Sequence, residues 1–372
     1  MKTVRVLVVD DDAGMLRAVE RLLAPQHDVV CCRTPGDALL SAQRHPPDIA
    51  LLDVRMPEMS GFELLDRLRQ RWPDLDVILM TGSVHSFDVH LVQAIRAAAY
   101  YFIEKPFDRE VLRTLVERCA VARRLREENR RHLARIEREL RVARTFQRSL
   151  LPGGPLHCGR CLLTGRYAPC DDLGGDFYDY AAAGDWAGFL VADVAGHGAG
   201  AAMLTGIVKA AFRESAATAH APQDVVRRVL AHLRTIGSQR FMSLLCGRID
   251  PGAGRLEFLS AGHPAAIHLG RGRAPRLLEP TGPLVSPLLD EQTWELAGVP
   301  FAPGDRLLVY TDGVVEAAGD GEPFGLERLL SLVERHDAGA DALLARIEQA
   351  VRDHVGGRPL TDDIALLSAC YE

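Results

Sequence analysis

The segment DDLGGDFYDY, residues 171–180, places a glycine pair between aspartates. Three later stretches, VADVAGHGAG (191–200), YTDG (310–313) and TDDI (361–364), also set aspartate against an apolar run. Short apolar runs of this kind are typical of buried strands, and a loop at a strand end can turn an acid toward a shared centre. Carboxylate oxygens are the ligands that hard divalent cations prefer. We therefore expect one metal centre that brings together Asp176, Asp193, Asp312 and Asp363.

Length and composition indicate how many domains the chain has and which kinds of partner it is expected to bind. The chain has 372 residues, 47% of them hydrophobic and 25% charged, with a net charge of -6. This length fits two domains with a connection. The negative charge argues against nucleic acid as the main partner, and no apolar run reaches the roughly 18 residues that span a bilayer. The N-terminus lacks the apolar core of a signal peptide, so we expect a cytoplasmic protein whose eight cysteines are reduced.

The first part of the chain alternates short β-branched runs with helical patterns. Strand-like runs occur at 4–9 (VRVLVV), 28–32 (DVVCC), 48–53 (DIALLD), 76–82 (DVILMTG) and 100–104 (YYFIE). This alternation predicts an α/β doubly wound parallel sheet. Ligand sites in such sheets lie beyond the carboxyl ends of the strands. The residues expected at that edge are Asp10, Asp11, Asp53, Thr81 and Lys105.

These residue types fit phosphoryl transfer to a carboxylate. Three acids can hold Mg²⁺, with water and phosphate oxygens completing its octahedron. One of the acids can act as the nucleophile that forms an acyl phosphate. A hydroxyl and an ammonium group can then bind the phosphoryl oxygens.

The motifs VLVVDDD, LLDVRMPEMSGFELL, ILMTG and IEKPF resemble those of response-regulator receiver domains, over residues 1–121. The resemblance implies a (βα)5 fold in which Asp53 is the phosphoacceptor. Asp10 and Asp11 would bind Mg²⁺ together with Asp53. Thr81 would be the switch hydroxyl, and Lys105 would contact the phosphoryl group.

The same resemblance implies a partner, either a sensor histidine kinase or a phosphotransfer protein. It also implies a cis bond between Lys105 and Pro106, which proline permits at low cost. Phe102 departs from the pattern, because the family often has a switch tyrosine there. Two alternatives remain: a flavodoxin-like sheet whose acids only cap helices, and a receiver that is never phosphorylated.

The connector, residues 108–151, contains neither glycine nor proline. Apolar residues recur at alternating spacings of three and four, a heptad seam that Arg126, Asn129 and Gln147 interrupt. The seam consists of Leu112, Leu115, Cys119, Ala122, Leu133, Ile136, Leu140, Ala143 and Leu150. We expect a long helical linker that forms a homodimeric coiled coil. A helix folded back on its own domains and a basic helix for nucleic acid or membrane are the alternatives.

The rest of the chain, residues 155–372, is long enough for one large core. Its strand-like runs cluster and its helical stretches cluster, which predicts an α+β or layered fold rather than βαβ units. Two metals about 3.5–4 Å apart, bridged by a carboxylate, would activate water for in-line attack on a phosphate ester. Gly174, Gly196 and Gly198 would let the backbone approach such a cluster closely.

Most of this second part resembles the bacterial branch of the metal-dependent, type 2C protein phosphatases, the sporulation stage II E-like and sigma-B-regulating group. The likeness is carried by RSLLP, DLGGDFYDY, VADVAGHGAGAAML, FMSLLCGRID, LSAGHPAAI, LLVYTDGVVEA, FGLERL and TDDIALL. It implies a four-layer αββα sandwich over residues 155–372. It also implies two Mn²⁺ or Mg²⁺ ions, with water rather than a side chain as the nucleophile.

Carried over by motif, Asp176 and Asp193 bind the two-metal centre and Asp193 bridges it. The carbonyl of Val194 is a further ligand. Asp312 and Asp363 complete the shell of the first metal. Asp362 is the alternative to Asp363 as the ligand from the TDDI motif.

Further residues have supporting or open roles. Gly175 and Gly196 would give the centre room, and His197 is either a proton donor or a support of the glycine turn. Asp171, Asp172 and Asp179 are expected as caps or as a solvated rim. Val285–Ser286–Pro287 replaces the glycine-rich turn of relatives. Cys158 and Cys161, with Cys170 nearby, form a weak signal for a zinc or redox site.

Together these patterns predict a response regulator whose phosphorylation at Asp53 controls a protein serine/threonine phosphatase. By resemblance, the substrate is a phosphoserine or phosphothreonine on an anti-anti-sigma-type partner-switching protein. The alternative is a phosphatase-like adaptor that binds a partner without turnover. A DNA-binding regulator is disfavoured, because no helix-turn-helix follows the receiver.

Overall fold

The structure is a computed structural model that describes residues 4–82, 101–289, 293–319, 321–334 and 339–372. The chain divides into two compact units, Met1–Arg135 and Ile136–Glu372. The first unit contains β1 (Arg5–Val9), α1 (Ala13–Leu23), β2 (Asp28–Cys32), α2 (Pro35–Arg44), β3 (Ile49–Asp53), α3 (Gly61–Arg71), β4 (Asp76–Thr81), β5 (Tyr101–Glu104) and the start of α5 (Arg109–Leu150). The helix expected between the last two strands falls within 83–100, outside the described residues.

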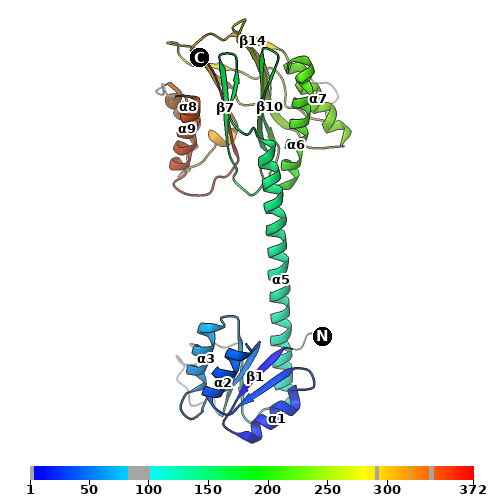
Figure 1. Ribbon diagram of the computed structural model, residues 1–372, viewed down its shortest axis with the longest axis vertical. Coiled ribbons are helices and arrows are strands. Elements are labelled where there is room, and N and C mark those ends of the chain that lie inside the picture. Colours follow the sequence, from blue (N-terminus) through cyan, green and yellow to red (C-terminus); the bar gives the residue numbers. More distant parts are fainter. Residues whose placement is uncertain (1–3, 83–100, 290–292, 320, 335–338) are drawn as a thin grey trace. The chain divides into compact units, whose positions relative to one another are not determined.

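The five strands of the first unit form a parallel sheet in the order β2-β1-β3-β4-β5. Helices cover both faces, α2 and α3 on one and α1 and α5 on the other (Figure 1). The central strands are therefore buried on both sides, which is why they consist of uninterrupted apolar residues. The predicted doubly wound receiver sheet is confirmed.

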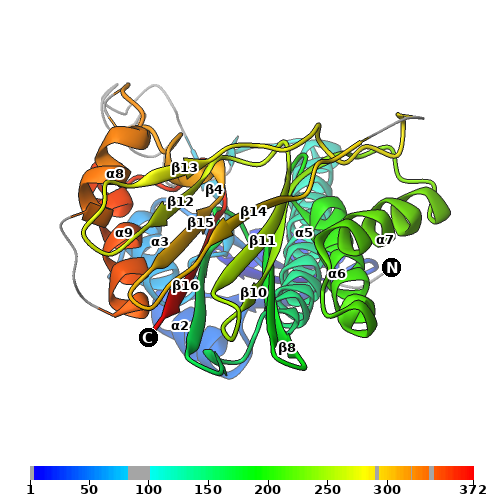
Figure 2. The same cartoon turned by 90° about the horizontal axis from the view of Figure 1, so that it is seen from above.

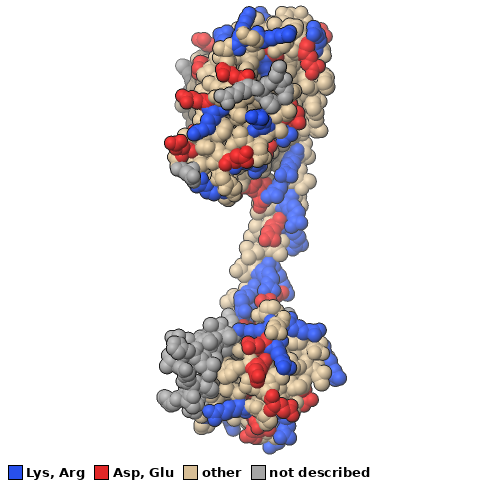
Figure 3. Space-filling view, turned by 90° about the vertical axis from the view of Figure 1, so that its left-hand side faces the viewer, with Lys and Arg blue, Asp and Glu red and all other residues tan. Residues whose placement is uncertain are grey.

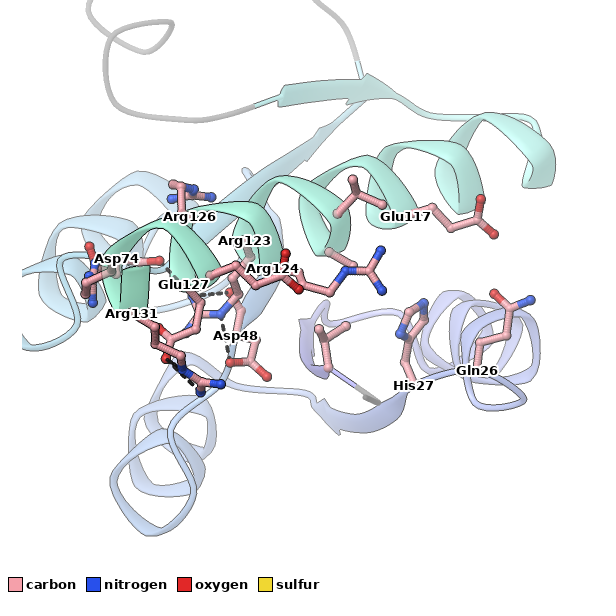
Figure 4. A pocket seen from close by; sticks show the side chains of 15 residues that line it. Gln26, His27, Asp48, Asp74, Glu117, Arg123, Arg124, Arg126, Glu127 and Arg131 are labelled. Carbon is pink, nitrogen blue, oxygen red and sulfur yellow. Dashed lines mark hydrogen bonds and ion pairs between the residues drawn. The ribbon is translucent and has the colours of Figure 1, made fainter. Parts of the chain in front are cut away.

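The start of α5 belongs to the core of the first unit. Leu112, Val116 and Cys119 are fully buried against the sheet. Further along, Arg123 pairs with Asp48 at 2.9 Å, and one Arg126 guanidinium nitrogen lies 2.7 and 2.6 Å from the two oxygens of buried Asp76. Figure 4 shows Arg123 with Asp48 beside a cavity of about 850 Å³ between α5 and the segment that carries Gln26 and His27. The first heptad positions are thus occupied by contacts within the chain.

The middle of α5 has a different environment. Leu133 is 54% exposed and Ile136 is 52% exposed. Figure 3 shows basic side chains, drawn in blue, along this helix, and the sequence of α5 makes them all arginine. Only this stretch of the apolar seam is open for a second chain, so the predicted coiled-coil dimer stays a prediction.

The described residues of the second unit contain the end of α5, two sheets and four further α-helices. Its strands are β6 (Leu156–Cys158), β7 (Cys161–Ala168), β8 (Asp176–Ala183), β9 (Trp186–Val194), β10 (Met242–Asp250), β11 (Arg255–Ala261), β12 (Ala266–Leu269), β13 (Arg276–Leu278), β14 (Ala297–Pro300), β15 (Arg306–Tyr310) and β16 (Ile364–Tyr371). Its helices are α6 (Ala199–Glu214), α7 (Pro222–Thr235), α8 (Gly325–Glu334) and α9 (Ala340–His354), with short 3-10 turns at Ser215–Thr218 and Asp312–Val314.

The two sheets have the orders β14-β11-β10-β9-β8 and β13-β12-β15-β16-β7-β6. One apolar core, which includes Phe189 and Leu367, joins the inner faces of the two sheets. A second core packs α6 and α7 on the first sheet, and a third packs α8 and α9 on the other. Figure 2 shows the resulting four layers, helix, sheet, sheet and helix. This agrees with the predicted αββα sandwich.

The last turns of α5 pack into the second unit. Gln147 is 7% exposed, and its side chain donates to the carbonyl of Gly174 at 2.6 Å and accepts from the amide of Gly174 at 3.3 Å. The carbonyl of Leu150, the last residue of the helix, accepts a hydrogen bond from Lys209 of α6. The helix therefore ends against the DDLGGD segment. None of the helices in the described part of the chain is long and apolar enough to cross a membrane.

Candidate functional site

The first cluster of acids lies at the carboxyl edge of the parallel sheet. Asp10 follows β1 and is 1% exposed, Asp53 ends β3 and is 7% exposed, and Asp11 is exposed. Ligand atoms of these three residues lie within 4.8 Å of one another. The structure thus brings the predicted acids together in a set that fits one hard divalent cation.

Lys105 neutralises part of this charge. Its Nζ lies 2.7 Å from Asp10 Oδ2 and 3.1 Å from Asp53 Oδ2. Burial raises the pKa of Asp53, and the hydrogen bond from Lys105 opposes that rise. Burial lowers the pKa of Lys105, but the hydrogen bonds to Asp10 and Asp53 outweigh it and leave the pKa above its usual value. The ammonium group is therefore held charged beside Asp53.

The remaining receiver residues also occupy the predicted positions. Thr81 ends β4 and is 2% exposed, at the same edge as Asp53. The Lys105–Pro106 bond is cis, as predicted. Phe102 lies in β5 and packs against the core that includes α2 and α3.

The second cluster starts from a strand pair. Asp176 begins β8 and Asp193 lies near the end of β9, and the antiparallel register places them directly opposite each other. Asp176 is 3% exposed and accepts a 2.6 Å hydrogen bond from the Thr311 hydroxyl. Cross-strand neighbours have side chains on the same face of a sheet, so the two carboxylates share one site.

Burial, together with repulsion between the carboxylates, makes the charged form of this site costly. Burial, together with the charge of Asp193, raises the pKa of Asp176 well above its usual value. Burial, and then Asp312, Asp362 and Asp363, raise the pKa of Asp193 to about 7. The pKa of Asp312, in the turn after β15, is raised by burial and then by Asp362. A divalent ion would offset the cost of holding these charges together.

Asp363 is held by backbone groups. Its Oδ1 accepts from the Cys170 amide at 2.9 Å and its Oδ2 from the Gly175 amide at 2.7 Å. A side chain on Gly174 would collide with the Asp363 carboxylate, so glycine is required at that position. Asp362 is exposed, and its carboxylate accepts from the Asp363 amide at 2.8 Å.

The loop after β9 carries the other predicted residues. The Val194 carbonyl lies against Gly175, where a side chain would come within 2.6 Å of it. Gly196 and Gly198 have φ of 91° and 76°, which a residue with a side chain rarely adopts. His197 is exposed and makes no hydrogen bond with any residue that the structure describes.

The four predicted ligands do not form one tight set. Within the described ranges, the only groups of three or more acids, cysteines or histidines whose ligand atoms all lie within 4.8 Å are the receiver triad and Cys170 with Asp362 and Asp363. Asp176 and Asp193 instead occupy the neighbouring strand pair β8–β9.

One expectation from the sequence is wrong, and the weak signal for a zinc site is not supported. Asp179 is fully buried rather than part of a solvated rim, and it pairs with Lys209 at 3.2 Å and with Arg213 at 2.6 Å. Cys158 and Cys161 pair across the β6–β7 hairpin, whereas Cys170 follows the opposite end of β7. At about 3.3 Å per residue, the eight-residue strand separates them by roughly 20 Å, so they share no zinc site.

Sequence reasoning missed three residues at this site. Thr311 holds Asp176, Gln147 holds Gly174, and Arg240 donates to the Ala195 carbonyl at 2.6 Å beside Gly196. The polar break that Gln147 makes in the heptad seam was the one available signal for it. Thr311 follows β15 and reaches Asp176 of β8 from the other sheet, whereas Arg240 precedes β10 and reaches Ala195 through the pairing of β10 with β9.

Comparison with known proteins agrees with the two parts of the chain. Residues 6–117 match the family model described as response regulator receiver domain. Residues 184–372, half of the chain, match the family model of stage II sporulation protein E (SpoIIE).

Individual relatives cover part of the chain. Protein IcfG of Synechocystis is 26% identical over 62% of this chain and 41% of its own length. Phosphoserine phosphatase RsbP of Bacillus subtilis is 25% identical over 48% of this chain and 46% of its own length. The chain thus spans less than half the length of these two curated relatives.

A solved structure agrees with the fold of the second unit. The SiaA-PP2C domain of Pseudomonas aeruginosa matches with a TM-score of 0.57 and 23% identity, over 65% of this chain and 99% of that domain. With the fold, the carboxylate site and the family match in agreement, the chain belongs to the SpoIIE family of PP2C-type phosphatases and carries a response regulator receiver domain ahead of its phosphatase domain.

Proposed function

We propose that phosphorylation of Asp53 controls a metal-dependent protein serine/threonine phosphatase in the second half of the chain. The observation that carries the proposal is the register of β8 and β9, which sets Asp176 opposite Asp193 within reach of Asp312, Asp362 and Asp363. Burial first, and then the repulsion between neighbouring carboxylates, raises the pKa values of Asp176, Asp193 and Asp312. An adaptor that only binds a partner has no use for such a cluster.

The donor set fits two Mn²⁺ or Mg²⁺ ions, because every donor of the proposed set is a carboxylate or carbonyl oxygen. In the proposed assignment Asp176 and Asp193 would hold the ions, and the Val194 carbonyl would be a further ligand. Asp312 and Asp363 complete the set. Such ions supply an activated water and neutralise charge on the phosphate ester.

The chain's own groups orient these ligands. The Thr311 hydroxyl fixes one oxygen of Asp176. The amides of Cys170 and Gly175 fix both oxygens of Asp363 and leave their remaining lone pairs free. Ligands that are held before substrate arrives need no rearrangement during the reaction.

The receiver would take its signal at Asp53. Asp10, Asp11 and Asp53 fit one Mg²⁺, and the Asp53 carboxylate would accept the phosphoryl group from a histidine kinase, a phosphotransfer protein or a small acyl phosphate. Lys105 lies 3.1 Å from Asp53 and can bind the added oxygens. Thr81 would supply the switch hydroxyl. The proposed domain limits are 1–121, 108–151 and 155–372.

The linker helix provides the connection. In its first part, Arg123 pairs with Asp48 and Arg126 pairs with Asp76. In its last turns, Gln147 forms a hydrogen bond with Gly174. We propose that a change of state at Asp53 alters how α5 holds the segment before Asp176, through the geometry of a homodimer.

The proposed substrate is a phosphoserine or phosphothreonine on an anti-anti-sigma-type partner-switching protein. The name of the relative RsbP, a phosphoserine phosphatase, supports the residue type. The test is phosphate release from a phosphoserine protein of this type with Mn²⁺ present. We expect turnover by the full chain and a loss of at least 100-fold in Asp312→Asn. Binding of the phosphoprotein without any turnover would favour the adaptor, and full activity of Asp312→Asn would refute the ligand assignment.

A further inference from the structure

The exposed apolar side chains of the second unit are concentrated in one region. Outside α5, the large apolar residues that are exposed in the described part of this unit lie on α6, on 236–241 or on 284–296, and α8 and α9 expose none. The residues that we call the apolar rim are Ile236, Phe241, Leu284, Leu288 and Leu289. Apolar side chains that gather on a surface in this way mark a binding site.

Backbone pairing joins the two segments that carry most of the rim. Met242 and Val285 exchange two hydrogen bonds of 3.0 Å, and both side chains are fully buried. Phe241 and Leu284 come just before them in the chain. Because side chains alternate along an extended backbone, these two point to the opposite, exposed side.

The turn that carries the other leucines is joined to α7. The Leu289 carbonyl accepts a 2.6 Å hydrogen bond from Arg234 in the last turn of α7, and Ile236 is the C-cap of that helix. Within the turn, the Leu288 amide donates to the Ser286 hydroxyl at 3.3 Å, while the Leu288 side chain is 65% exposed. The rim is therefore one surface, formed by the end of α7, the start of β10 and the turn at 284–289.

The rim borders the carboxylate centre. The Phe241 carbonyl accepts from the Ala195 amide at 3.0 Å, and the Ala195 carbonyl accepts from Arg240 at 2.6 Å. Ala195 directly follows Val194, whose carbonyl is a proposed ligand, and Asp193 comes just before. A protein that covers the rim would thus lie next to the place where the phosphate ester is proposed to react.

A positive charge stands at this border. The Arg240 guanidinium lies against the glycine turn, where a side chain on Gly196 would come within 2.5 Å of Nη1. Among the residues that the structure describes, Arg240 bonds to the Ala195 carbonyl but forms no ion pair with an acid. A guanidinium without an acidic partner suits a phosphate group, which accepts strong charge-assisted hydrogen bonds.

We propose that the apolar rim docks the phosphoprotein substrate, which presents apolar side chains beside its phosphoserine or phosphothreonine. Arg240 attracts the phosphate, and the rim binds the flanking side chains. A second copy of this chain fits the rim less well, because a lasting contact there would crowd the approach to the carboxylates. This docking role rests on the proposed phosphatase function and specifies what that function recognises.

The test compares two phosphoserine peptides that differ only in the flanking residues, which are leucines in one and serines in the other. An extended chain spans about 3.3 Å per residue, so about six residues on each side of the phosphoserine reach roughly 20 Å. With the full chain and Mn²⁺, kcat/KM for the leucine peptide should exceed that for the serine peptide by about tenfold, because the rim removes the leucines from water. Equal values in wild type would overturn the proposal.

Leu288→Glu should reduce this preference to less than about twofold. The preference is a ratio of two rates from one preparation, so it does not depend on the fraction of the enzyme that is folded. Leu40→Glu is the matched control, because Leu40 is also an exposed leucine but lies on α2 of the first unit, and it should keep the wild-type preference. An unaltered preference in Leu288→Glu would overturn the proposal. Loss of a dimer in Leu288→Glu, seen by light scattering with its preference intact, would assign the rim to contact between copies instead.

Arg240→Gln tests the charge separately. Glutamine keeps an N–H group for the Ala195 carbonyl but carries no charge, so KM should rise about tenfold for both peptides, and Arg240→Lys should recover part of the loss. A glutamine variant that matches wild type would overturn the assignment of the phosphate to Arg240.

Hydrolysis of para-nitrophenyl phosphate separates the docking role from the proposed function, since this small substrate has no flanking residues. Its hydrolysis by wild type without a preference between the peptides would refute docking at the rim alone. A wild type that hydrolyses neither this compound nor the peptides would refute the phosphatase function and the docking role together.

Discussion

Gln147 and Gly174 are joined by two hydrogen bonds, one in each direction, between the side chain of the linker helix and the backbone of the acid-bearing segment. Gly174 in turn lies against Asp363 and precedes Asp176 by two residues. The end of α5 therefore bears directly on the position of two proposed metal ligands.

Replacing Gln147 by leucine should impair the phosphatase. The substitution keeps the size of the side chain but removes both hydrogen bonds and leaves two buried backbone groups unpaired, at about 1–3 kcal/mol each. We expect Mn²⁺-dependent hydrolysis to fall by about tenfold, measured as kcat/KM. Ser149→Ala is the control, because its exposed hydroxyl bonds only to its own helix at Phe146. Equal activity of the two variants would contradict this role of Gln147.

Thr311 should set the affinity for metal. Its hydroxyl orients Asp176, and ligand orientation by neighbouring groups is worth about 10–100-fold in metal affinity. Thr311→Val should raise the Mn²⁺ concentration for half-maximal activity by about tenfold. Thr311→Ser keeps the hydroxyl and should stay close to wild type. If valine and serine behave alike, the hydrogen bond to Asp176 does not position the ligand.

His263 should make the fold sensitive to acid. It is 1% exposed, its Nδ1 lies 2.7 Å from the Ser243 hydroxyl, and burial lowers its pKa to about 3. A depressed pKa means that the unfolded chain binds the proton more readily, so the free energy of unfolding falls as pH drops below about 6.5. The contribution reaches about 1.4 kcal/mol per pH unit.

The measurement is the free energy of urea unfolding of wild type and of His263→Asn. It is made between about pH 7.5 and about pH 5, a range that spans the usual imidazole pKa of about 6.5. Asparagine does not titrate, so the variant should lose stability less steeply below about pH 6.5 even if it is less stable throughout. Parallel curves for the two proteins would show that His263 is not buried in its neutral form.

The exposed part of the α5 seam should mediate dimerisation. Leu133 and Ile136 are each more than half exposed and lie at the spacing of a coiled coil. Leu133→Glu should convert a dimer into a monomer, measured as mass by light scattering. Val142 is 71% exposed but lies off the seam, so Val142→Glu should leave the dimer intact. A monomeric wild type would contradict the proposal.

The receiver site was predictable because each of its strands can be recognised from a short local stretch of sequence. Each buried run is short and ends in the residue that carries the chemistry, so Asp10, Asp53 and Thr81 were placed at one edge before any pairing was known. The same argument placed Asp176, Asp193 and Asp363 at strand ends. Their relative positions depend on the registers of β8 with β9 and of β7 with β16, which no local pattern contains.

Asp179 shows where such reasoning fails. It stands among other aspartates in DDLGGDFYDY and so resembles a solvated acid, but it lies within β8 with its side chain buried. The compensating charges, Lys209 and Arg213, lie on α6, about thirty residues later.

The most direct test measures phosphate release from a phosphoserine protein with Mn²⁺, with and without a small acyl-phosphate donor, in wild type and in Asp53→Ala. We expect the donor to change the wild-type rate severalfold, in either direction, and to leave the rate of Asp53→Ala unaltered. An equal response of both proteins to the donor, or no response in wild type that is phosphorylated at Asp53, would contradict control of the phosphatase by the receiver.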